Sequence, residues 1–180
     1  MRPNVRPSDF DFRRVVGYFA TGVAIVTAID DVPVGFTVQA LCSLSLDPPL
    51  ILVCVGRAST TWPRVAASGQ LCINLLSENQ VGLARQFAVS GGDKYVGVSW
   101  TPSECLGLPV IDGSLAWIDG EIVSVMEGGD HWIAVCQVLA LEARTGVRPL
   151  ILSRGEFGTV VPMRQRHRQR RLAKEPGSVR

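Results

Sequence analysis

The chain has 180 residues, of which 47% are hydrophobic and 19% charged, a composition typical of one globular domain that buries its own core. Its formal net charge of +2 is unevenly distributed: without the arginine-rich segment from residue 164 onward, 11 basic and 15 acidic residues remain, a net charge of −4. An acidic body that lacks a basic and aromatic face argues against nucleic-acid binding, and the lack of any apolar run of about 18 residues argues against a membrane-spanning helix.

The first predicted element is an amphipathic helix over residues 8–20. Ser8 is a preferred N-cap residue, and the carboxylates of Asp9 and Asp11 suit the positive end of a helix dipole. One apolar stripe with spacings of three and four residues is formed by Phe12, Val15, Val16 and Phe19. Gly22 is expected to end the helix.

Short β-rich runs separated by turn residues make up most of the remaining chain. The runs predicted as strands are 23–29, 34–46, 50–56, 71–76, 114–127, 131–145 and 148–160. The turn "GGD" at 128–130 is expected to join two of them into a long hairpin. Two further helices are predicted, a short one that begins near Ser59–Thr61 with Pro63 in its first turn, and one over 77–88 that is capped by Ser77.

These elements predict a mostly β fold. Six or seven strands, few helices and no regular alternation of strand and helix favour an antiparallel barrel or sandwich. The long apolar runs favour strands that are covered on both faces. One face would fill the core and the other would need a helix or a second subunit to cover it, so we expect a homodimer. Residues 1–162 are expected to form this one domain. Residues 163–180 are expected to form a basic, disordered tail, for which contact with an anion or nucleic acid is the alternative.

The cysteine pattern bears on the cellular compartment. The five cysteines are Cys42, Cys54, Cys72, Cys105 and Cys136. Their number is odd and their spacing matches neither a disulfide framework nor a zinc site, so we expect free thiols, no metal and a reducing cytoplasm. Acidic residues near the N-terminus stand where a signal peptide needs an apolar stretch, and we expect no export.

Most catalytic motifs are missing from the sequence. It contains no G-x-S-x-G, no G-x-G-x-x-G and no G-x-x-x-x-G-K-[ST] pattern, so a nucleophile elbow, a Rossmann site and a P-loop are not predicted. Two polar segments remain. Residues 37–45 alternate small polar and apolar side chains. Residues 56–61 place hydroxyl groups and Arg57 before a predicted helix, either as an anion site or as an ordinary strand–turn–helix with an N-cap.

His131 is the one histidine outside the arginine-rich segment, which contains His167. It follows the glycine turn at 128–130 and begins an apolar run. From its surroundings alone, His131 is either a hydrogen-bonded structural residue at a strand start or a functional imidazole.

An ordered set of segments resembles the flavin reductase family that serves two-component flavin monooxygenases. These segments span about residues 10–158 and include "FRRVVGYFATGVAIVTA", "VGFTVQALCSLSLDPPLILVCVGRASTTW", "GQLCINLL", "LARQFA", "DKYVGVSW", "DGSLAWIDGEI", "GGDHWIAVCQV" and "PLILSRGEF". The resemblance implies a six- to seven-stranded antiparallel Greek-key split barrel that forms a homodimer. It implies NAD(P)H-dependent reduction of FAD or FMN, with NADH and FAD favoured, and delivery of reduced flavin to a partner flavin-dependent monooxygenase.

The same resemblance implies a set of site residues. Thr37, Val38, Gln39 and Ala40 would lie along the isoalloxazine, with Cys42, Ser43 and Ser45 near the ring and ribityl chain. The ribityl and phosphate would be held by Cys54, Val55, Gly56, Arg57, Ser59, Thr60 and Thr61. The far end would be flanked by Phe87, Lys94 and Tyr95, and the pocket closed by Arg154, Gly155 and Phe157. His131 would meet the nicotinamide. A flavin- or haem-binding carrier or sensor without turnover is the alternative, because one fold hosts many functions.

Overall fold

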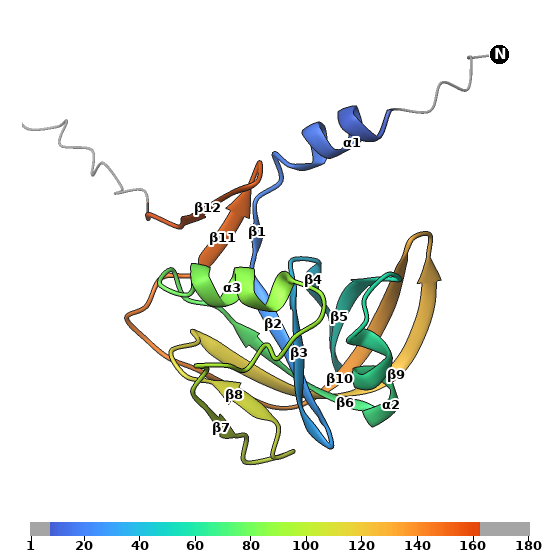
Figure 1. Cartoon of the computed structure of the whole chain (residues 1–180), viewed down its shortest axis with the longest axis vertical. Helices are drawn as coiled ribbons and strands as arrows, with labels where there is room; N and C mark the ends of the chain where they lie inside the picture. Colours follow the sequence, from blue (N-terminus) through green and yellow to red (C-terminus); the bar gives the residue numbers. More distant parts are fainter. Residues whose placement is uncertain (1–7, 163–180) are drawn as a thin grey trace, which may run out of the picture.

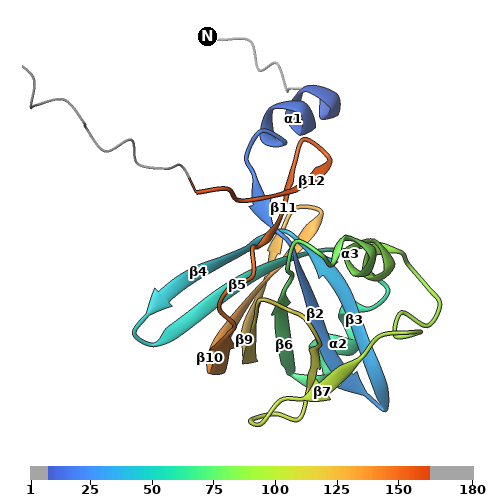
Figure 2. The ribbon, with the colours of Figure 1, turned by 90° about the vertical axis from the view of Figure 1, so that its left-hand side faces the viewer.

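In the computed structural model, which describes residues 8–162, seven strands form one antiparallel sheet. They are β2 (Ala24–Asp30), β3 (Val32–Val38), β4 (Leu41–Leu46), β5 (Pro49–Gly56), β6 (Gln70–Leu75), β9 (Ala116–Gly128) and β10 (His131–Ala143). Their order is β3-β2-β6-β9-β10-β5-β4, and Figures 1 and 2 show the sheet strongly curved. The predicted split barrel is therefore confirmed. The expected tail, 163–180, lies outside the described residues.

The barrel core explains the apolar runs of the sequence. On β5, Ile51, Val53 and Val55 alternate with less buried residues, as in a strand with one face in the core. On β2, consecutive residues are buried because both faces are covered. Val26 lies in the barrel core, whereas Ile25 belongs to a second cluster outside the barrel.

Three helices lie outside the barrel in the described part of the chain: α1 (Asp9–Val16), α2 (Trp62–Ser68) and α3 (Val81–Ala88). The Ser8 hydroxyl accepts a hydrogen bond from the Asp11 amide at 3.1 Å, so the predicted N-cap is confirmed. The helix ends at Gly17 rather than at Gly22, which lies in the short strand β1 (Thr21–Gly22). None of the residues of α1 is buried, and Figures 1 and 2 show this helix standing clear of the barrel.

Three further predicted elements differ from the structure. The run 34–46 is interrupted at residues 39 and 40, where the chain leaves β3 and enters β4. The run 148–160 is a hairpin, β11 (Leu150–Ser153) and β12 (Glu156–Thr159), because the intervening residues adopt positive φ angles. The helix predicted over 77–88 begins only at Val81. Two short strands, β7 (Trp100–Pro102) and β8 (Pro109–Ile111), occupy the long connection before β9.

A buried polar side chain ties β8 to the barrel. Asn74 on β6 is fully buried; its Oδ1 accepts a hydrogen bond from the Ile111 amide at 2.7 Å, and its Nδ2 donates to the Thr27 hydroxyl and the Pro109 carbonyl, each at 3.2 Å. Such a group specifies one arrangement of β2, β6 and β8, because an unpaired buried amide is unfavourable.

We expect Asn74→Ala to lower the free energy of unfolding by about 2–4 kcal/mol, because it leaves the buried Ile111 amide without an acceptor and opens a small cavity. Urea unfolding of the two proteins measures the difference. The exposed Asn79 provides the matched control: Asn79→Ala is expected to change the stability by less than about 0.5 kcal/mol. Equal stability of the Asn74 and Asn79 variants would contradict the role given to this network.

Candidate functional site

A large cavity lies where the barrel is split. Strand β3 is an edge of the seven-stranded sheet, and β5 lies near the other edge. Between them is a cavity of about 590 Å³. It is lined by Phe36, Thr37, Val38, Gln39, Ala40, Cys54, Val55, Gly56, Ala58, Ser59, Thr60, Thr61, Phe87, Ala88, Ser90, Lys94 and His131. An edge strand presents unpaired backbone N–H and C=O groups, so this wall can hydrogen-bond a planar heterocycle.

Most of the site residues that the family resemblance implied lie together around this cavity. Segments 37–40, 54–56 and 59–61 lie on the cavity wall together with Phe87, Lys94 and His131. Phe36, Ala58, Ala88 and Ser90 also line the cavity and were not predicted from the sequence. All four have small or apolar side chains, and nothing in their chemistry distinguishes them from ordinary core or loop residues.

The placement of β4 removes three predicted residues from the cavity. Cys42, Ser43 and Ser45 do not line it, and Cys42 and Ser43 are exposed. The reason is the interruption at residues 39 and 40, after which β4 forms the edge of the sheet beside β5, and the β4–β5 turn projects from the barrel (Figure 2). Cys54, on the neighbouring strand, does line the cavity, and burial together with the nearby Cys42 raises the pKa of its thiol.

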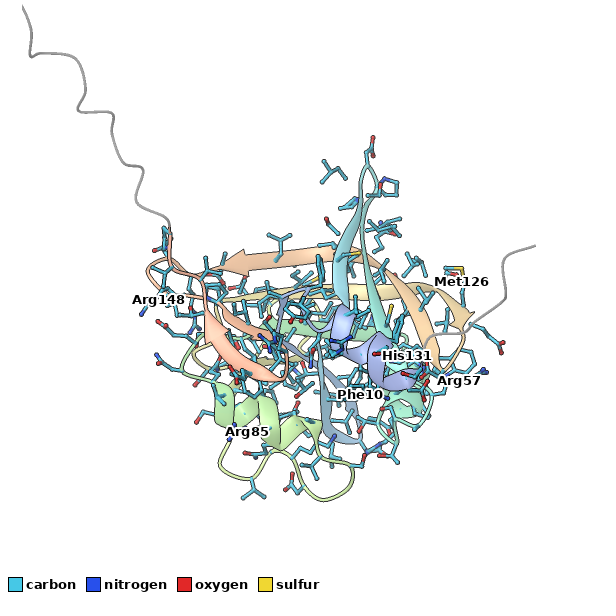
Figure 3. The ribbon with its side chains drawn as sticks, turned by 90° about the horizontal axis from the view of Figure 1, so that it is seen from above. Phe10, Arg57, Arg85, Met126, His131 and Arg148 are labelled. Atoms are coloured by element: carbon cyan, nitrogen blue, oxygen red, sulfur yellow. The ribbon has the colours of Figure 1, made fainter. Side chains whose placement is uncertain are left out.

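Arg57, expected to clamp a phosphate, points away from the cavity. Its guanidinium lies 4.3 Å from the ring centre of Trp132 and donates a hydrogen bond to Glu127 at 2.9 Å. Its backbone amide donates to the Asp130 carbonyl at 2.9 Å. Arg57 therefore fastens the loop after β5 to the β9–β10 turn, where Figure 3 shows it beside His131.

The remaining predicted residues lie behind or beyond the cavity. The Tyr95 ring packs edge-on against Phe87 at a centroid distance of 5.2 Å, and its hydroxyl donates to the Val34 carbonyl at 3.2 Å; burial raises its pKa. The last three predicted residues, Arg154, Gly155 and Phe157, lie on the β11–β12 hairpin. This hairpin contacts the segment after α1 and does not line the cavity. The predicted pocket closure by this hairpin does not occur within the described chain.

At one part of the cavity wall the structure fixes the imidazole of His131. Its Nδ1 lies 2.7 Å from an Asp130 carboxylate oxygen, and this hydrogen bond holds the pKa of the carboxyl below its usual range. Since a carboxylate only accepts, the neutral ring carries its proton on Nδ1 and keeps Nε2 as an acceptor. A methyl group at Gly56 would lie 3.9 Å from Nε2, so the ring lies against the cavity wall. Asp130 was not predicted as a site residue, although it directly precedes His131.

Lys94 provides a positive charge at another part of the wall. Its Nζ donates to the carbonyls of Gly35 and Phe87, each at 3.2 Å, and to the Thr61 hydroxyl at 3.4 Å. Partial burial lowers its pKa. Within residues 8–162, no carboxylate lies within ion-pair distance of this ammonium group. A cation held only by neutral acceptors is suited to an anionic ligand.

Residues 8–162 show neither a metal-binding cluster nor a helix that could cross a membrane. No group of three or more histidine, cysteine, aspartate or glutamate side chains between residues 8 and 162 is placed to hold a metal ion. No helix in this part of the chain has the length and apolar character needed to cross a membrane.

Comparison with known proteins gives one consistent result. Residues 16–160 match the family model of the flavin reductase like domain. The chain is 44% identical over 154 residues to HsaB, the reductase subunit of a flavin-dependent monooxygenase from Mycobacterium tuberculosis, and the match covers 84% of this chain and 82% of the relative. Two solved structures are similar. The nitrilotriacetate monooxygenase component B homologue of Mycobacterium thermoresistibile has a TM-score of 0.82 at 40% identity, covering 95% of this chain and 92% of that one. The NADH:FAD oxidoreductase SgcE6 of Streptomyces globisporus, in complex with NAD and FAD fragments, has a TM-score of 0.83 at 34% identity, covering 88% and 96%.

Proposed function

Because this chain belongs to the flavin reductase like family, we propose that it is an NADH-dependent flavin reductase that supplies reduced FAD to a partner flavin-dependent monooxygenase. The observation that carries the proposal is the cavity at the barrel split, with backbone and hydroxyl groups along its wall, the imidazole of His131 and the ammonium group of Lys94. The HsaB relative is named as a reductase subunit of such a monooxygenase, and the SgcE6 structure contains NAD and FAD fragments.

The residues of the cavity fit a flavin nucleotide. The unpaired edge of β3 and the connection through Gln39 and Ala40 offer backbone groups to the polar rim of an isoalloxazine. The hydroxyls of Ser59, Thr60 and Thr61 suit the ribityl chain. Lys94 supplies a counter-charge for the phosphate. Phe87, which is fully buried, backs this wall and gives it an apolar surface.

Flavin reduction by a nicotinamide needs little chemical participation from the protein side chains. When bound, the two cofactors themselves supply hydride transfer from nicotinamide C4 to flavin N5. The protein must hold the two rings in contact, orient them and keep water out. His131, with its Nδ1 proton fixed by Asp130 and its Nε2 against the cavity wall, is placed to accept a hydrogen bond from the nicotinamide carboxamide and so to orient that ring. The wall of backbone amides is suited to stabilise negative charge on the flavin rim.

The direct test is oxidation of NADH by the purified protein with FAD or FMN, followed at the nicotinamide absorbance. We expect flavin-dependent turnover, faster with NADH than with NADPH. Tight flavin binding without oxidation of either nicotinamide, above a buffer control, would instead establish the carrier or sensor function. The five free cysteines support a reducing, cytoplasmic location, which cell fractionation measures.

The exposed apolar side chains support a homodimer. Phe10, Phe12 and Phe19 are 75%, 61% and 77% exposed on and just after α1. Leu44 and Leu46 project from the β4–β5 hairpin, 50% and 92% exposed. So many large apolar groups on one chain are typical of a surface that is covered in the assembly. A second copy of the chain is the proposed partner.

We expect light scattering after gel filtration to give twice the mass of the chain. Phe12→Asp should raise the dimer dissociation constant at least about tenfold, because a charge in an apolar contact loses its hydration. Val96, 69% exposed in the connection after α3, gives the control Val96→Asp, which is expected to remain dimeric. A monomeric wild-type protein at micromolar concentration would contradict this proposal.

A further inference from the structure

Arg57 lies between two parts of the cavity wall, although it does not line the cavity itself. On one side, the hydroxyl-bearing residues 59–61 follow it closely in the chain. On the other side, Gly56, which directly precedes it, lies opposite His131 in the ladder of β5 and β10. The segment proposed to hold the flavin and the imidazole proposed to orient the nicotinamide are therefore connected through this residue.

The hydrogen bonds of Arg57 go to the turn that carries His131. Its backbone amide donates to the Asp130 carbonyl at 2.9 Å. Its guanidinium donates to the Glu127 carboxylate at 2.9 Å and to the Gly129 carbonyl at 3.4 Å. All three acceptors belong to the four residues that precede His131, so one residue holds the chain on its approach to the imidazole.

The guanidinium of Arg57 also stacks on Trp132, the residue that follows His131. The guanidinium carbon lies 4.3 Å from the centre of the indole ring. The ion pair with Glu127 is exposed, 41% and 69% for the two side chains, and exposed ion pairs contribute little by themselves. A planar group that stacks on an indole while it donates to two oxygen atoms has no equivalent in lysine. The arrangement therefore depends on the shape of the side chain more than on its charge.

The imidazole of His131 depends on this turn for its position. His131 is the first residue of β10, and its side chain is hydrogen-bonded to the adjacent Asp130. Because this partner is its neighbour in the chain, the hydrogen bond moves with the turn and does not tie the imidazole to the barrel. A displacement of the turn by about 1 Å would carry the imidazole with it, and a misplacement of that size is enough to slow a reaction between two oriented rings.

We propose that Arg57 is a positioning residue, which holds the β9–β10 turn, and through it the imidazole of His131, in the geometry that orients the nicotinamide over the flavin. This inference rests on the proposed function. The guanidinium lies outside the cavity and acts without touching either cofactor. This role differs from the phosphate clamp that the family resemblance implied, and the two roles give opposite results in the same assays.

The test is Arg57→Met, measured by stopped-flow reduction of bound flavin by NADH and by fluorescence titration of flavin. We expect the rate constant for flavin reduction to fall about tenfold and the Kd for FAD to change by less than about twofold. A phosphate ligand would give the reverse, a Kd raised at least about tenfold with the rate constant of the flavin-bound protein kept. Arg57→Lys should recover little of the rate, because lysine lacks the planar stack, whereas lysine is itself a good phosphate ligand.

A double-mutant cycle tests whether Arg57 acts through His131. In the His131→Ala background, Arg57→Met should lower the rate constant by less than a further factor of about two, because the residue that it positions is already absent. Arg148 provides the matched control, since it forms an exposed ion pair with Glu78 at 3.0 Å and does not line the cavity. Arg148→Met should leave both the rate constant and the Kd unchanged. Losses that multiply in the double variant would overturn the inference.

Proton spectra of the His131 ring give a readout that does not need turnover, recorded in His167→Ala so that one histidine remains. We expect the ring resonances to shift in Arg57→Met and to keep their positions in Arg148→Met. Unchanged resonances in Arg57→Met would overturn the inference. If this variant does not fold, Arg57→Lys decides in its place, and wild-type rate and resonances there would overturn the inference. Failure of the proposed function gives a different result, namely no NADH oxidation by the wild type with either flavin.

Discussion

Replacing His131 with alanine is expected to lower kcat/KM for NADH by about 10- to 100-fold, because a nicotinamide that has lost its orienting contact spends little time in a reactive geometry. The Kd for FAD should change by less than about twofold, since the flavin wall is built from other elements. Stopped-flow reduction of bound flavin by NADH and fluorescence titration of flavin separate the two effects.

A second variant tests the hydrogen bond between Asp130 and His131. Asp130→Asn keeps the size of the side chain but removes the charge that holds the proton on Nδ1, so a smaller loss than that of His131→Ala is expected in the same assay. His167→Ala, which changes the one other histidine of the chain, is the control and should behave like the wild type. Unchanged NADH kinetics in His131→Ala would show that the imidazole is only a structural residue of the β9–β10 turn.

Replacing Lys94 with methionine is expected to raise the Kd for both FAD and FMN by about 10- to 100-fold, the loss that follows when a charge-assisted hydrogen bond of about 1.5–3 kcal/mol is removed. Methionine retains an apolar stem of similar length, so the loop after α3 keeps most of its packing. Arg85→Met provides the control, because Arg85 is a cation of α3 that lies over Phe157 and does not line the cavity at the barrel split.

The pH dependence gives a second measurement on the same residue. Burial lowers the pKa of Lys94, so in the free protein the ammonium loses its proton at a lower pH than an ordinary lysine. Flavin affinity in the wild type should therefore fall as the pH rises through this lowered pKa, and the fall should be absent in Lys94→Met. Parallel pH profiles for the two proteins would show that Lys94 does not contact the phosphate.

The sequence predicted those parts of the fold that depend on local pattern. Ser8 caps α1 because its hydroxyl reaches an amide three residues later, an interaction that the sequence alone contains. The hairpin of β9 and β10 follows from apolar runs on both sides of Gly128 and Gly129. The end of α1, by contrast, is set at Gly17, whose carbonyl accepts a hydrogen bond from the Arg154 amide at 2.8 Å; this contact joins residues that are far apart in the chain.

In the site, as in the fold, local sequence predicted some features, and contacts between distant residues determined the others. The family resemblance located the segments of the cavity wall, but the direction of single side chains depends on partners from other strands. The guanidinium of Arg57 is a common phosphate ligand, yet Trp132 and Glu127 on the β9–β10 hairpin hold it outside the cavity. A smaller cavity of about 310 Å³ beside β3 was not predicted, because it arises where residues 32–35 and 91–95 come together.

The two-residue connection between β3 and β4 also limits how the cavity can deform. Gln39 and Ala40 join the strands covalently, and the three Cα–Cα steps from Val38 to Leu41 span at most about 11 Å, so this side of the split has a nearly fixed width. The opposite wall, from Ser90 to Tyr95, is joined to β3 by hydrogen bonds from Lys94 and Tyr95 and to α3 by one from Gln86. The mechanical compliance of the site is therefore one-sided. Ligands of different thickness are accommodated by movement of residues 90–95, while the connection between β3 and β4 keeps its shape.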